Sequence, residues 1–172
     1  TLENRFRKKV IVLRHRPSVL PILSAFIYGK KAAEERAANT LPRQGGNSST
    51  FSSFLRFSYY LVDFIFGQFF VWFKYTLRGD VILYDRYYFD FIEDAKRSNI
   101  TLPRWFRKVF YRFVHKPSVN VFLHAKPELI LERKQELSYE DIEKLTTSYK
   151  ELFKELDGKY SGKYVSIENE ET

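Results

Sequence analysis

Cysteine and methionine are both absent from the 172 residues of this chain. Without cysteine the chain can form neither a disulfide nor a thiolate metal site, and a reducing compartment is compatible with it. Without methionine it has no initiator, so we expect a fragment, a processed form or an incomplete sequence of a longer protein. No signal peptide is visible at the amino end. We therefore expect a cytoplasmic protein.

Long charge-free apolar runs are also lacking. The most apolar segment, residues 51–80, is interrupted by Arg56, Asp63 and Lys74. Its charge-free stretch at 64–73 is about half of the roughly 20 residues that a membrane-spanning helix needs. We expect a long, mostly buried helix that ends at Gly79, and no transmembrane segment.

Aromatic and basic residues are abundant. Apolar residues make up 44 % of the chain and aromatic residues 18 %, and the formal net charge is +8. This composition predicts one soluble domain over residues 1–172, large enough to bury a core. The basic excess suits an anionic partner, which could be a phosphorylated metabolite, a nucleic acid or a membrane surface.

Short apolar runs alternate with helical patterns along the chain. The runs lie at 10–14, 81–84, 118–124 and 163–168, and none alternates cleanly between apolar and polar residues. This pattern predicts an α/β fold, namely a three-layer α/β/α arrangement around a doubly wound parallel sheet. The polar segment 39–50 contains Gly45 and Gly46 and predicts a mobile loop.

Three helices are expected in the second half. Residues 103–116 predict an amphipathic helix with an aromatic face opposite a basic one. Pro127 opens a helix through Glu136, and Ser138 with Asp141 predicts the N-cap of a helix running to Leu156.

Charged side chains follow the expected strands. Arg14 and Arg16 follow the first strand, Asp85 and Arg86 the second, and His124 ends the third. In parallel sheets, ligands bind at the carboxyl ends of the strands. One guanidinium group can bind two phosphate oxygens at once, and a carboxylate can hold a hydroxyl or hydrated Mg²⁺. The sequence therefore predicts an anion site here, whereas a lone His124 is more typical of a structural histidine.

Several segments together resemble one enzyme family. They are "VIVLRHRP", "TLRGDVILYDRYYFD", "PSVNVFLHAKPELILERKQEL" and "SYEDIEKLTTSYKELFKEL". Their order and spacing, from about Val10 to Ile167, resemble the thymidylate kinase-like family of P-loop nucleoside monophosphate kinases. The resemblance implies a P-loop kinase that transfers the γ-phosphate of ATP to a nucleoside monophosphate or a related small anionic metabolite.

The resemblance also implies cofactors, partners and roles. ATP and Mg²⁺ are the expected cofactors, no nucleic acid is expected, and the oligomeric state stays open, with a homodimer as one candidate assembly. A short lid at 133–138 would carry Arg133 and, less specifically, Lys134. The expected catalytic residues are Asp85, which would hold Mg²⁺ through water, Arg86 and Arg133; the expected substrate-binding residues are Arg14, Arg16, Tyr87 and Tyr88.

The chain departs from the family pattern at several places. The motif G-x-x-x-x-G-K-S/T is absent, and "QGGNSST" has neither its lysine nor its spacing. The resemblance therefore implies that the first strand and the P-loop lie upstream, and that the closing helix lies downstream. Tyr60 and Leu61 stand where the family has an Asp-Arg pair, which leaves the phosphate acceptor open and dTMP in doubt.

Two alternatives remain at this point. Asp85 and Arg86 could form a structural ion pair, and Tyr87 and Tyr88 could belong to the core. The whole chain could also be a non-catalytic remnant of the fold that acts as a basic, aromatic module docking on membrane or nucleic acid.

Overall fold

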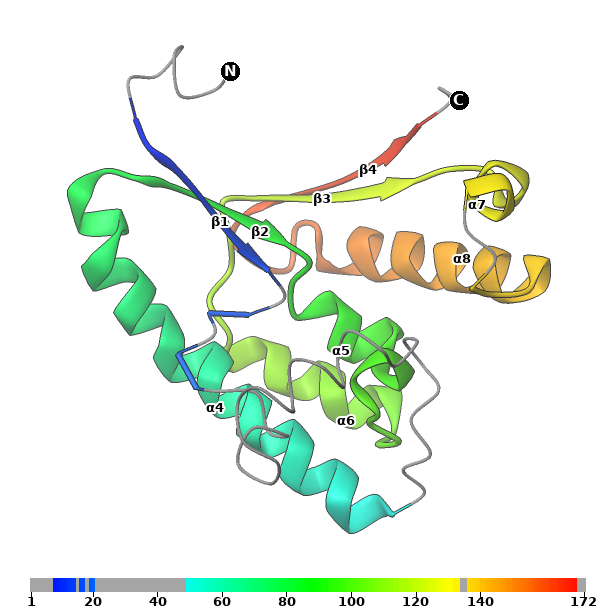
Figure 1. The fold of residues 1–172 in the computed structure, drawn as a ribbon, viewed down its shortest axis with the longest axis horizontal. Helices are drawn as coiled ribbons and strands as arrows, with labels where there is room; N and C mark the ends of the chain where they lie inside the picture. The colour runs from blue at the N-terminus through cyan, green and yellow to red at the C-terminus, as the bar shows by residue number, and fades with distance from the viewer. Residues whose placement is uncertain (1–7, 15, 18, 21–48, 134–135, 170–172) are drawn as a thin grey trace. The chain divides into compact units, whose positions relative to one another are not determined.

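The computed structural model describes residues 8–14, 16–17, 19–20, 49–133 and 136–169 (Figure 1). It divides into two compact units, residues 1–115 and residues 116–172, which are described separately. Each unit combines helices with a small parallel sheet, which makes the chain a mixed α/β protein. The loop predicted at 39–50 lies outside the described residues except for Ser49 and Thr50, which begin a helix.

The first unit is built on a parallel strand pair. Strand β1 (Val10–Arg14) runs beside β2 (Val81–Asp85), so that Val10 lies opposite Val81 and Arg14 opposite Asp85. Parallel neighbours need a crossover connection, and α4 (Thr50–Lys74) with the short η1 (Thr76–Arg78) belongs to it. Gly79 then ends η1 in the left-handed region, with φ of 78°. The predicted strands are confirmed, and Gly79 is a helix stop as predicted, but it ends η1, whereas α4 itself ends at Lys74.

Helix α4 is only partly buried. Ser49 caps its start, since its Oγ accepts a hydrogen bond from the Ser52 N–H at 3.4 Å. Phe57, Phe64 and Val71 are buried on one side, whereas the opposite side carries many exposed apolar residues. The segment Thr50–Arg78 is long and apolar enough to cross a membrane, and a third of its most apolar window is buried. The expectation of a mostly buried helix is therefore wrong.

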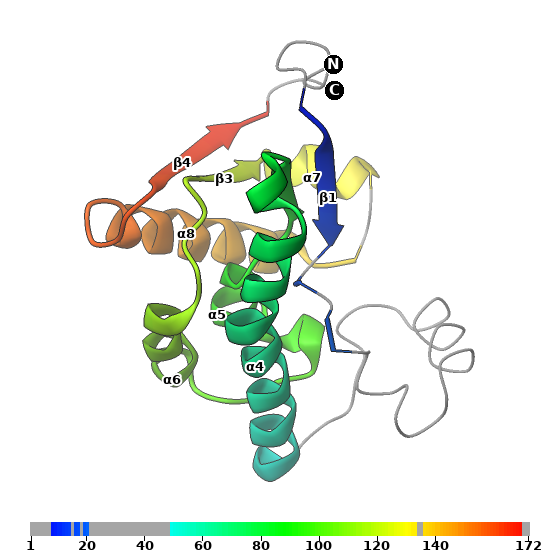
Figure 2. The ribbon, with the colours of Figure 1, turned by 90° about the vertical axis from the view of Figure 1, so that its left-hand side faces the viewer.

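The remaining helices of the first unit are short. They are α5 (Phe89–Glu93), η2 (Ala95–Ser98), α6 (Arg104–Val109) and η3 (Phe110–Phe113). Figure 2 shows α4 beside α5 and α6. Phe57 of α4 meets the rings of Phe106 and Phe110 at centroid distances of 5.7 and 5.6 Å. Aromatic contacts of this kind join α4 to the chain that follows β2.

The amphipathic helix predicted at 103–116 differs from the structure. It is divided into α6 and η3, and Trp105 and Phe113 of its predicted apolar face are exposed. Arg107, predicted on the basic face, is instead buried, and its guanidinium donates to the carbonyl oxygens of Leu102, Phe91 and Ile92. The carbonyls near the end of a short helix need donors from elsewhere, and Arg107 supplies them.

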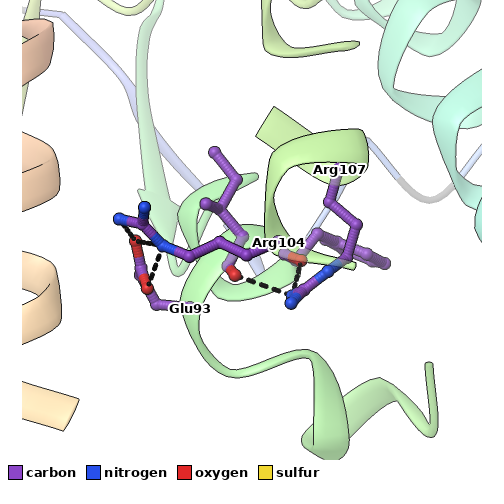
Figure 3. Close-up of polar contacts among 5 residues, drawn as sticks. Glu93, Arg104 and Arg107 are labelled. Carbon is purple, nitrogen blue, oxygen red and sulfur yellow. Dashed lines mark hydrogen bonds and ion pairs between the residues drawn. The ribbon is translucent and has the colours of Figure 1, made fainter. Parts of the chain in front are cut away.

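Arg107 has a charged neighbour that supports the same connection. Arg104 donates from Nε to both carboxylate oxygens of Glu93 at 3.0 Å (Figure 3). Burial lowers the pKa of the Arg107 guanidinium, and the negative charge of Glu93 offsets only part of this shift. The two arginines of α6 therefore attach that helix to the end of α5.

The second unit is another parallel pair with its helices. Strand β3 (Val119–His124) pairs with β4 (Lys163–Glu168), and α7 (Pro127–Arg133) and α8 (Tyr139–Leu156) lie between them in sequence. Phe122 of β3 stacks on Tyr149 of α8 at 4.7 Å. The predicted N-cap is confirmed, since Ser138 Oγ accepts from the Asp141 N–H at 3.2 Å.

The four described strands form two separate two-stranded sheets. Backbone hydrogen bonds join β1 to β2 and β3 to β4, and both pairs are parallel as predicted. The single doubly wound sheet with helices on both faces is not confirmed.

Candidate functional site at the ends of β1 and β2

A buried carboxylate on α4 fixes the chain that follows β1. Asp63 is 1 % exposed, and its Oδ2 is ion-paired with the guanidinium of Arg16. Its Oδ1 accepts the backbone N–H groups of Val19 and Leu20 at 3.0 and 2.9 Å. A buried carboxylate requires such donors, because desolvation of an unpaired charge is very costly. Asp63 therefore holds this part of the chain against α4.

Two further contacts reinforce the same attachment. Arg16 donates to the Leu20 carbonyl oxygen at 2.9 Å, and its guanidinium lies 5.2 Å from the ring centroid of Tyr60. Pro17 packs on Gly67, where an added Cβ would lie only 2.7 Å from Pro17 Cβ. Helix α4 therefore needs glycine at this turn so that the chain after β1 can approach closely.

These contacts distinguish Arg14, the last residue of β1, from Arg16, which follows the strand. Arg16 is buried and engaged with Asp63, so it positions the chain, and its predicted contact with substrate stays a prediction. Arg14 has a side chain that is 84 % exposed and directly accessible to a ligand. The Arg16 N–H also donates to the Arg14 carbonyl oxygen at 2.8 Å, which ties Arg16 to the end of β1.

The residue after Asp63 fixes the chain that follows β2. Phe64 is fully buried and meets the rings of Tyr87 and Tyr88 edge to face, at 5.5 and 5.3 Å. Tyr88 donates its hydroxyl to the Arg107 carbonyl oxygen at 2.8 Å, and burial raises its pKa. Tyr87 donates to the His115 carbonyl oxygen at 2.7 Å. Both tyrosines are core residues here, and their predicted stacking on a substrate stays a prediction.

The two attachments bring three charged residues to the same end of the strand pair. Arg14 and Asp85 are register partners, with Arg14 Nε 4.0 Å from Asp85 Oδ2 and the Asp85 side chain 60 % exposed. Arg86 follows at once and pairs with Asp90, with Nη1 3.1 Å from Oδ2. Because neighbours in register point to the same side of a parallel pair, the side chains of Arg14 and Asp85 lie on the same side of these two strands.

Arg86 has an unusual backbone. Its φ is 74°, which lies in the left-handed region that residues other than glycine adopt at a cost of about 1–3 kcal/mol. Strain of this kind persists where the surrounding structure holds it, and it is found preferentially at functional sites. The buried Tyr87 and Tyr88 hold the following backbone, so the direction of the Arg86 side chain is set by the fold.

The site can bind an anion and, through water, a divalent metal. Two arginines supply planar donor groups for phosphate oxygens. Asp85 is one accessible carboxylate, and in the described part of the chain no group of three or more His, Cys, Asp or Glu side chains could hold a metal ion. A Mg²⁺ ion commonly keeps several waters and binds one or two carboxylates together with substrate phosphates, which fits Asp85.

Other predicted residues belong to the second unit. Arg133 is the last residue of α7 and is exposed, whereas Lys134 lies outside the described residues. The predicted lid at 133–138 therefore spans the end of α7, two undescribed positions and the N-cap of α8. His124 is buried, and burial lowers its pKa, as does the charge of Lys150. The interpretation of His124 as a structural residue agrees with this burial.

Sequence reasoning missed Asp63. Its position inside an otherwise apolar helix was the available signal, because a charged residue on the buried side of a helix must have a partner. The partner could not be identified, since Arg16 is far from Asp63 in sequence and several basic residues precede α4.

Comparisons with protein-family models, with curated proteins and with solved structures find no match for this chain. The residues of the site and their geometry therefore carry the functional inference.

Replacing Asp63 by Asn should unfold the first unit more easily. Removing one partner of a buried ion pair leaves the Arg16 charge uncompensated, so we expect a loss of about 3–5 kcal/mol in the free energy of unfolding. Asp85→Asn is the matched control, because its carboxylate is exposed and its loss should change stability by about 0.5 kcal/mol or less. Urea unfolding of both variants measures the difference, and equal losses would contradict the role given to Asp63.

Replacing Arg86 by Gly should not destabilise the chain. Glycine adopts φ of 74° without strain, which relieves about 1–3 kcal/mol. The lost pair with Asp90, in which the Arg86 side chain is 38 % exposed and the Asp90 side chain 13 %, costs about 1 kcal/mol. We therefore expect a free energy of unfolding that is unchanged or raised by about 1 kcal/mol. Arg104→Gly is the control, since it also loses an ion pair but lies in a helix, where glycine costs about 1 kcal/mol. A loss above about 2 kcal/mol in Arg86→Gly alone would show that Arg86 has a structural role.

Proposed function

We propose that this chain is part of a P-loop kinase of the thymidylate kinase-like family, which transfers the γ-phosphate of ATP to a nucleoside monophosphate or a related small anionic metabolite. The observation that supports this most directly is the arrangement of Arg14, Asp85 and Arg86. They share the carboxyl end of a parallel strand pair, are accessible, and include one strained residue. This is where α/β enzymes bind their ligands.

Each residue has a defined task in this proposal. Phosphoryl transfer needs little covalent chemistry from the protein and depends on alignment and on neutralisation of developing negative charge. Arg14 and Arg86 bind the anionic group of the acceptor. Asp85 orients the acceptor or holds hydrated Mg²⁺, which, when bound, neutralises phosphate charge. The family resemblance gives Arg133, on α7 of the second unit, the role of a lid arginine that stabilises charge during transfer.

The proposal includes a larger sheet than the two strand pairs. A parallel sheet is ordinarily covered on both faces, whereas β1 and β2 expose Val12 and Leu83, and β3 and β4 expose Val121 and Ile167. In the proposed three-layer, doubly wound fold, a further strand with its P-loop and helices belongs to the same sheet. That segment would also supply the groove for the ATP phosphates, for which these residues contain no motif.

The proposal is tested by phosphate transfer with the complete gene product. ATP labelled at the γ-phosphate is incubated with Mg²⁺ and each nucleoside monophosphate, and labelled diphosphate is measured. We expect at least one acceptor to be phosphorylated. Asp85→Asn should lower kcat and kcat/KM together by roughly 10²-fold, because it removes a preorganised charge that acts on the transition state.

Glu151→Gln is the matched control, because Glu151 is an exposed carboxylate on α8 of the second unit. It should leave the transfer rate unchanged. Full turnover by Asp85→Asn would end the role given to this residue, and a folded protein that phosphorylates no anionic acceptor would contradict the proposed function.

A further inference from the structure

The exposed side of α4 is an apolar surface with no charged residue along its centre. Its central residues recur at spacings of three, four and seven, so they share one helix face. Each is 44 % exposed or more, and the face runs the whole length of the helix. We call it the α4 stripe; its residues are Phe51, Leu55, Val62, Phe66, Phe69 and Phe73.

The opposite side of α4 is occupied by the first unit itself. Asp63 is buried there with its ion pair to Arg16, and Phe64 is enclosed by the aromatic rings after β2. A helix held in this way does not leave its unit to cross a bilayer, because Asp63 would lose its donors in hydrocarbon. The α4 stripe is therefore a one-sided surface, and only its outer face can contact lipid.

Basic residues gather at one end of the stripe. Lys74 and Arg78 are exposed at the end of α4 and in η1, and Lys8 and Lys9 are exposed just before β1. The Lys9 carbonyl oxygen accepts the Val81 N–H at 2.9 Å, which places the two lysines at the strand end that follows Arg78. Trp72 and Tyr75 lie at the same end of α4. Aromatic and basic residues in combination are typical of the boundary between lipid headgroups and acyl chains.

We propose that the α4 stripe rests on the surface of an anionic lipid bilayer, with Lys8, Lys9, Lys74 and Arg78 against the headgroups. The apolar side chains then enter the boundary between headgroups and acyl chains, as they do in interfacial helices. A second copy of the chain fits less well. Neither the first turn of α4 nor the stripe contains an acidic residue. If a second copy packed its own stripe on this one, the basic residues at the end of α4 would therefore find no acidic partner on it.

Vesicle sedimentation of the full chain tests the proposal. The chain should sediment with vesicles of phosphatidylcholine mixed with phosphatidylglycerol, and much less with phosphatidylcholine alone. The double variant Phe66→Ser/Phe69→Ser should lower partitioning about tenfold or more, because two large apolar side chains no longer enter the lipid. The control variant Trp105→Ser/Phe113→Ser removes two equally exposed aromatic residues elsewhere in the unit and should bind as the parent does.

The basic end is tested in the same assay. Lys74→Gln and Arg78→Gln should each lower partitioning into the anionic vesicles roughly fivefold, the effect expected for one charge near such a surface. Lys144→Gln and Lys154→Gln, which change exposed lysines of α8, should have no effect. If the α8 variants lowered partitioning as much as Lys74→Gln and Arg78→Gln do, the proposal that the basic end of α4 contacts the headgroups would be overturned.

Tryptophan fluorescence locates the contact. The chain has two tryptophans, so Trp105→Phe leaves Trp72 as the single reporter and Trp72→Phe leaves Trp105. Trp72 emission should shift to shorter wavelength with anionic vesicles and be quenched by brominated lipid, whereas Trp105 should do neither. A shift at Trp105 alone, no vesicle binding, or a lipid-free dimer that Phe66→Ser/Phe69→Ser converts to monomer would overturn the proposal. None of these outcomes depends on phosphate transfer, so failure here is separate from failure of the proposed kinase.

Discussion

The candidate site depends on the ion pair and hydrogen bonds of the buried Asp63 carboxylate. This carboxylate attaches the chain after β1 to α4 through Arg16 and two backbone N–H groups, and Phe64, the next residue, packs against the chain after β2. One turn of one helix therefore fixes both strand ends. Arg14 and Asp85 meet in register because the strands are paired, and the direction of Arg86 is set by Tyr87 and Tyr88, which pack against Phe64. Arg14, Asp85 and Arg86 are exposed, whereas the side chains of Asp63, Phe64 and Arg16 that position them are buried.

This separation explains which charged residues can act on a ligand. Arg16 and Arg107 have the chemistry of anion-binding residues, yet each is buried and donates to groups of the protein itself. Arg14 and Asp85 make only a loose ion pair at 4.0 Å and remain solvated, so a phosphate or hydrated metal can compete for them. Arg86 has a left-handed backbone with φ of 74°, and strain of this kind is found preferentially at functional sites.

The sequence predicted the local structure better than the long-range contacts. The four strands, their parallel direction and the Ser138 cap follow from short apolar runs and from neighbouring residues, and all are confirmed. The expectation that α4 is mostly buried was wrong. Apolar residues lie all around this helix, and composition does not say which side packs against the rest of the unit. The partners of Asp63 and Arg107 could not be predicted. Asp63 pairs with an arginine from a distant segment, and Arg107 donates to carbonyl oxygens of another segment. The periodicity of a sequence carries no information about such contacts.

The central proposal is that Arg14 and Arg86 bind the anionic group of the acceptor, whereas Arg16 holds the chain after β1 against α4. Nuclear magnetic resonance of the arginine Nε–Hε groups, assigned by single Arg→Lys variants, tests this during titration of the complete protein with the acceptor. The account predicts saturable shifts for Arg14 and Arg86, while the Arg16 signal stays in place because its guanidinium is held by Asp63. Saturable binding that shifts Arg16 and leaves Arg14 and Arg86 unchanged would contradict it.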